Sequence, residues 1–108
     1  MGRTFPEIGR FLRRLKGYRI ERAILFGSRA RGDWLKESDW DLLLVSEDFV
    51  GLSFRERSKC VLDFWLNSET LEVLCYTPEE FLRKRKQIGI VQTAAQEGIE
   101  LPIRQKAA

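Results

Sequence analysis

Residues 27–41 read GSRARGDWLKESDWD, and a short apolar run lies on either side of them. The preceding run is AILF at positions 23–26, and the following run is LLLV at positions 42–45. A short apolar run bounded by turn residues is typical of a strand that is buried on both faces. The sequence therefore predicts one buried strand that ends in a Gly-Ser turn and a second that opens with an Asp-x-Asp pair.

The Gly-Ser turn has the composition of a phosphate-binding turn. Gly27 lacks a Cβ atom, so a ligand can approach its backbone closely. Ser28 begins a predicted short helix, whose first N–H groups could hold a phosphate together with the Ser28 hydroxyl. The alternative is that Ser28 serves as the N-cap of this helix. Arg29 and Arg31 are interpreted as surface charges, although either could contact a phosphate.

The acidic pair has the composition of a metal site. Asp39 and Asp41 are separated by one residue, so on a strand both side chains leave the same face. Two ionised carboxylates that close together repel each other unless a cation compensates them. Oxygen ligands beside a phosphate site are those that Mg²⁺ prefers. The turn and the pair together favour a metal-bound nucleoside triphosphate over a solvated strand edge.

Gly27-Ser28, followed by ten residues and then Asp39-x-Asp41, resembles the signature of the minimal nucleotidyltransferases of the DNA polymerase beta-like superfamily. The resemblance covers nearly the whole chain. It implies an α/β fold, the single-domain nucleotidyltransferase fold, in which helices cover a small mixed β-sheet and the site lies at one end of the sheet.

The resemblance also implies a reaction, in which a nucleoside monophosphate passes from ATP or another NTP to a hydroxyl and pyrophosphate is released. Gly27, Ser28 and Arg29 would bind the nucleotide, and Asp39 and Asp41 would hold Mg²⁺, with two ions expected. The family has a third acidic residue on a later strand, more often Asp, where this chain has Glu72. We expect Glu72 to complete the metal site or to take the acceptor proton, and the alternative is a solvent-facing edge residue.

No residue of the chain identifies the acceptor, so the expectation about it comes from the family resemblance alone. Larger members carry a second domain that reads nucleic acid or an antibiotic, for which a chain of 108 residues has no room. Minimal members often occur beside a helical HEPN-type partner in toxin–antitoxin pairs, where the transferase can attach AMP to a tyrosine of the toxin. The resemblance implies such a partner here, and we expect an apolar surface for it or for a second copy of the chain.

Two other functional classes stay open. One is a catalytically idle nucleotide-binding antitoxin subunit that works by contact, and the other is a small nucleic-acid-binding module. The net charge of +3 suits an anionic ligand without singling out a nucleic acid.

Composition limits which residues can serve in acid–base catalysis or metal binding. The chain contains no His, and the spacing of Cys60 and Cys75 fits no metal site, so acid–base and metal work falls to carboxylates. Both cysteines lie in apolar stretches and are predicted to be buried, reduced thiols. The sequence shows neither a run of transmembrane length nor a signal-peptide pattern, so we expect a cytoplasmic protein without membrane contact.

The first helix is predicted to begin at Thr4, which forms a capping-box pattern with Glu7, and to end at Gly17. A basic cluster lies in and after this helix: Arg10, Arg13, Arg14, Lys16 and Arg19. We interpret the cluster as a solvated helix face, with an acidic partner or nucleic-acid phosphates as the alternative.

Three strands are predicted: Arg22–Phe26, Trp40–Ser46 and Leu71–Tyr76. A capping box at Ser53 and Glu56 begins the helix between the second and third strands, and Asn67-Ser68 closes it. A long helical connection implies a parallel crossover, whereas the connection between the first two strands allows either sense.

A third capping box, formed by Thr77 and Glu80, begins a last helix that ends at Gly98. Its predicted buried side consists of Phe81, Leu82, Ile88, Val91 and Ala95. The tail 104–108 is predicted to be disordered. These elements together predict one α/β domain over residues 1–108.

Overall fold

The computed structural model describes residues 5–32 and 39–103. The elements are α1 (Pro6–Arg14), β1 (Ile20–Phe26), α2 (Ser28–Arg31), β2 (Trp40–Ser46), the 3₁₀ turn η1 (Glu47–Phe49), α3 (Phe54–Leu62), β3 (Leu71–Tyr76), α4 (Pro78–Lys84), α5 (Ile90–Glu97) and β4 (Ile99–Leu101). No helix in these ranges has the length and apolar character that crossing a bilayer requires.

The strands form one mixed sheet in the order β3-β2-β1-β4. β2 and β3 are parallel, as the helical crossover through α3 predicts. β1 is antiparallel to both of its neighbours, β2 and β4. The prediction of a small mixed sheet is therefore confirmed, and the open question of the sense of β1 against β2 is answered.

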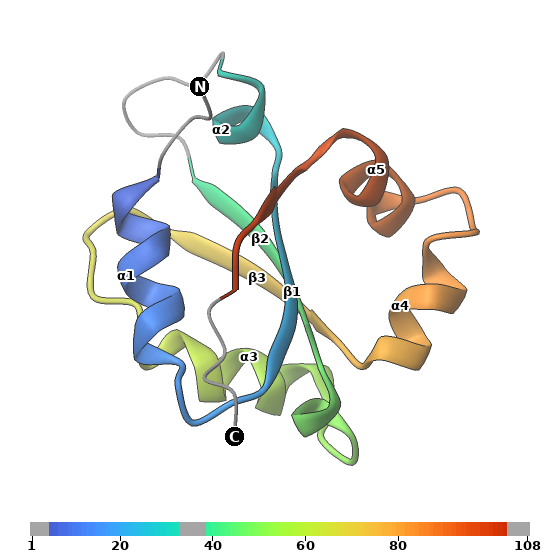
Figure 1. Ribbon diagram of the computed structural model, residues 1–108, viewed down its shortest axis with the longest axis horizontal. Helices are drawn as coiled ribbons and strands as arrows, with labels where there is room; N and C mark the ends of the chain where they lie inside the picture. Colours follow the sequence, from blue (N-terminus) through green and yellow to red (C-terminus); the bar gives the residue numbers. More distant parts are fainter. Residues whose placement is uncertain (1–4, 33–38, 104–108) are drawn as a thin grey trace.

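Helices cover both faces of the sheet (Figure 1): α1 and α3 lie on one face, and α4 and α5 lie on the other. The alternation of side chains along β2 explains why both faces need cover. Leu42 and Leu44 belong to the core beneath α1 and α3, whereas Leu43 and Val45 belong to the core beneath α4 and α5. Because all four are fully or almost fully buried, the predicted two-sided burial of this strand is confirmed.

Several predicted boundaries are confirmed. β2 and β3 have the predicted bounds, and both capping boxes, Ser53 with Glu56 and Thr77 with Glu80, are present. β1 begins at Ile20, two residues before the predicted start. The N-cap of α1 is Phe5, without a side-chain cap. Thr4 and the predicted disordered tail lie outside the described residues.

The predicted end of α3 at Asn67-Ser68 is wrong, because the helix ends at Leu62. The next residues turn to pack aromatic side chains against the core. Trp65 meets Phe11 edge-on with ring centroids 5.7 Å apart, and its indole N–H donates to the carbonyl of Glu69 at 2.7 Å. Tertiary packing of the turn therefore overrides the helical periodicity that continues in the sequence.

The prediction of a single last helix is also wrong, because the chain turns between Lys84 and Ile90 and forms α4 and α5 instead. The turn changes which side chains face the sheet. Phe81 and Val91 are buried and Ala95 is half-buried as predicted, whereas Leu82 and Ile88 are 55% and 98% exposed. Gly98 does end α5, and β4 follows it directly.

Candidate active site

The acidic residues lie at the end of the sheet where β2 and β3 both begin. Asp41 and Glu72 are partners in the parallel register, and Asp39 lies just before β2. The backbone N–H of Trp40 donates to the carbonyl of Thr70 at 2.9 Å, which ties the two strand starts together. Glu72 therefore lies level with Asp41 on the neighbouring strand.

The Gly-Ser turn lies against the same edge. β1 runs antiparallel to β2, so its last residue, Phe26, pairs with Asp41 and the chain then enters Gly27. Gly27 has φ 78°, and a Cβ atom there would collide with Oδ2 of Asp41 and lie 3.2 Å from its Cγ. A side chain here would therefore strain the backbone and would displace the Asp41 carboxylate. Figure 1 shows α2 directly beyond this end of β1.

Ser28 occupies the first position of α2 rather than its N-cap. The N-cap is Gly27, and the helix has no side-chain cap. The alternative interpretation of Ser28 as a capping residue is therefore wrong. Its assignment as a phosphate ligand stays a prediction.

Electrostatics couple the carboxylates to one another. The pKa of Asp41 is raised, mainly because the side chain is half-buried and further because Glu72 and Asp39 carry negative charge nearby. The positive charge of Arg31 acts in the opposite direction. Such a site favours a bound cation, which would offset the repulsion.

This donor set fits a hard divalent cation. Carboxylate oxygens are the ligands that Mg²⁺ prefers, and Asp41 has two acidic neighbours that it senses electrostatically. Within residues 5–32 and 39–103, no three His, Cys, Asp or Glu side chains are already gathered closely enough to hold a metal ion. The case for a divalent cation therefore depends on two facts: Asp39, Asp41 and Glu72 are all carboxylates, and they lie at the same end of the sheet.

Arg29 connects the turn to the acidic strand. It is only 7% exposed, and its guanidinium lies over the ring of Trp40 at 4.1 Å from the centroid. Trp40 in turn packs edge-on against Phe5 and Trp65. Arg29 is therefore not the surface charge that the sequence suggested, and its nucleotide-binding role stays a prediction. The sequence signal that could have predicted this contact is Trp40, the aromatic residue between Asp39 and Asp41.

Comparison with known proteins also points to a nucleotidyltransferase domain. A family profile described as a nucleotidyltransferase domain matches residues 6–97. The fold resembles the crystal structure of a proposed nucleotidyltransferase from Sulfolobus solfataricus, with a TM-score of 0.56 and 24% sequence identity. That match covers 98% of this chain and 95% of the other. A search of curated protein sequences found no significant match.

Proposed function

Because the chain belongs to the nucleotidyltransferase domain family, we propose that it moves a nucleoside monophosphate, AMP in the first instance, from a Mg²⁺-bound nucleoside triphosphate to a hydroxyl acceptor. One observation carries the proposal: Asp41 is the register partner of Glu72 and lies directly against Gly27. This juxtaposition joins the two predicted halves of the site, the phosphate turn and the acidic edge.

Each residue of the site has a proposed role. Asp39, Asp41 and Glu72 would hold Mg²⁺, which when bound neutralises phosphate charge in reactions of this class. Gly27, Ser28 and Arg29 would bind the nucleotide, with the Ser28 hydroxyl directed at its β- and γ-phosphates. Glu72 is exposed, so an acceptor hydroxyl can reach it and give up its proton there. Positioning and charge neutralisation would supply most of the rate enhancement.

We further propose a protein acceptor, a tyrosine of a HEPN-type partner in a toxin–antitoxin pair. Large apolar side chains on α4, on α5 and in the turn between them support a protein-facing surface. Leu82, Ile88 and Ile90 are 55%, 98% and 55% exposed. A second copy of this chain is the alternative occupant of that surface.

The direct test is to incubate the purified protein with α-labelled ATP, Mg²⁺ and the product of the adjacent gene. We expect label on the partner, and loss of label in Asp41→Asn and when Mg²⁺ is chelated. Tyrosine-to-phenylalanine variants of the partner would locate the acceptor. Mg·ATP binding without labelling of any partner would instead support the idle antitoxin subunit, and labelling that survives Asp41→Asn would refute the assigned site.

A further inference from the structure

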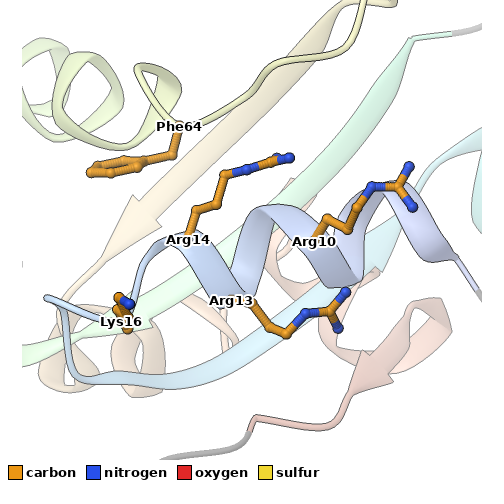
Figure 2. A pocket seen from close by; sticks show the side chains of 5 residues that line it. All are labelled: Arg10, Arg13, Arg14, Lys16 and Phe64. Carbon is orange, nitrogen blue, oxygen red and sulfur yellow. The ribbon is translucent and has the colours of Figure 1, made fainter.

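α1 borders a shallow hollow that is lined by four cations and one aromatic ring (Figure 2). The lining residues are Arg10, Arg13, Arg14, Lys16 and Phe64. Arg14 rises from α1 on the side where Phe64 lies, and Arg10 lies farther along the helix. On a helix, residues three and four apart are neighbours at about 5–6 Å between Cβ atoms, so Arg10 lies close to both Arg13 and Arg14.

Within the described part of the chain, the cations of this hollow form no ion pair with a carboxylate. The ion pairs found there join Arg22 to Glu100, Arg57 to Glu80 and Arg83 to Glu79, and none involves the four cations of the hollow. Neighbouring cations that form no ion pair repel each other, so an external polyanion would stabilise this surface.

Phe64 adds a feature that charge does not supply. It lies in the turn after α3, is half-buried, and packs edge-on against Tyr18 with ring centroids 6.5 Å apart. Sites for single-stranded nucleic acid combine a cationic track for the backbone with an aromatic ring on which a base stacks. A duplex keeps its base faces inside the stack, and an acidic peptide has no base to place on the ring.

We propose that this hollow binds a short single-stranded nucleic acid, with its phosphates against the four cations and one base against Phe64. Arginine suits this role because its planar guanidinium can donate two parallel hydrogen bonds to one phosphate. The proposal goes beyond the proposed transfer reaction and does not depend on it, because it concerns a surface built from α1 and the turn after α3.

The test is fluorescence anisotropy with labelled oligo(U) of about 12 nucleotides, a length within the range of known single-strand sites. The buffer contains EDTA and no nucleoside triphosphate, so the result is independent of transfer. Four phosphate contacts predict that log K falls with log salt at a slope of about −2.8. An oligo(dT) arm separates a preference for RNA from one for DNA, and binding of either supports the proposal.

The key variant is Arg13→Ala/Arg14→Ala, which should reduce the salt slope by about 1.4 and weaken binding roughly tenfold or more at low salt. Its matched control is Lys84→Ala/Lys86→Ala, which removes the same charge from α4 and the following turn. The control should change the dissociation constant less than about twofold. Equal weakening by both double variants, or none by the first, would overturn the proposal.

Phe64→Leu tests the stacking contribution and should weaken binding about fivefold or more while leaving the salt slope unchanged. Because Phe64 also packs on the core, urea denaturation must show that this variant is folded; the arginine variant decides the question if it is not. A Glu-rich peptide of equal charge is the competitor. Competition as strong as that of unlabelled oligo(U) would assign the surface to an acidic protein segment and overturn the proposal.

Discussion

The carboxylate of Asp41 lies between the Gly-Ser turn and the start of β3. Its neighbour across the antiparallel pair is the end of β1, its neighbour across the parallel pair is Glu72, and Gly27 leaves it the space that any Cβ atom would take. Gly27 is thus constrained by a carboxylate of the protein as well as by its proposed ligand.

Asp41→Asn should raise the melting temperature at neutral pH in the absence of divalent cations. The pKa of Asp41 is raised above its ordinary value of 3.8, so the native state holds this proton more tightly than the unfolded state does. Ionisation therefore destabilises the native state as pH rises above 3.8, and the penalty is complete above the native pKa. Thermal denaturation should show a gain for the variant at pH ~7 that vanishes below pH ~3.8. A variant that is less stable than wild type at neutral pH would contradict this.

Ser28→Ala should leave the free energy of unfolding within about 0.5 kcal/mol of wild type, because Gly27 and not Ser28 is the N-cap. If the hydroxyl binds phosphate, the same change should weaken ATP more than adenosine. Calorimetric titration of both ligands makes the comparison. An equal loss for ATP and adenosine would remove Ser28 from the phosphate site.

Glu72→Gln separates a chemical role from a structural one. As a proton acceptor, Glu72 should be needed for transfer but not for binding, so Mg·ATP affinity is kept and transfer falls roughly 10²–10⁴-fold. As a metal ligand, it should be needed for both. Parallel measurement of affinity and transfer decides between them, and full activity in the variant would leave a two-carboxylate site.

At the scale of elements, Arg57 joins the two sides of the sheet at its β3 edge. Its guanidinium donates to the carbonyls of Leu52 at 2.9 Å and Cys75 at 3.1 Å, and to the Glu80 carboxylate at 2.6 Å. Glu80 also accepts from the N–H of Thr77 in the capping box of α4. One buried side chain thus links α3, the end of β3 and α4.

Arg57→Met should lower the free energy of unfolding by about 3–5 kcal/mol, because it removes the cation paired with the Glu80 carboxylate and the donor to two carbonyls. The matched control is Arg22→Met, whose pair with Glu100 is far more exposed and should cost less than about 1 kcal/mol. Urea denaturation at neutral pH measures both. Arg57 lowers the pKa of Glu80, so the ion-pair share of the cost is full above pH 4.5 and is lost as pH falls through the native pKa. Equal costs for the two variants would contradict the account.

Local sequence patterns predicted some of the elements but not others. β2, β3 and the two capping boxes follow from local rules, because a buried strand and a helix start each carry their own signal. β4 could not be foreseen, since three residues are too few to show a period and their partner lies on β1. Gly98 was interpreted only as a helix stop. A Cβ atom there would lie 2.9 Å from the carbonyl oxygen of Leu25, which shows that it also lets the chain pass closely against β1.

At the scale of the whole molecule, the sequence predicted which residue types belong to the site but not the exact way they meet. The spacing of Gly27, Ser28, Asp39 and Asp41 could be read from the chain. That Glu72 is level with Asp41 depends on the register of two strands separated by a crossover, which no local pattern encodes. The burial of Arg29 on Trp40 likewise depends on how α2 folds back onto β2.

We propose that the end of the sheet formed by the Gly-Ser turn and the acidic residues binds Mg·ATP. Isothermal titration of ATP in the presence of Mg²⁺ into wild type and Asp41→Asn tests it most directly, because the variant is expected to stay folded. We expect measurable binding to wild type that disappears in Asp41→Asn and when Mg²⁺ is chelated. Mg·ATP affinity that is unchanged in Asp41→Asn would contradict it.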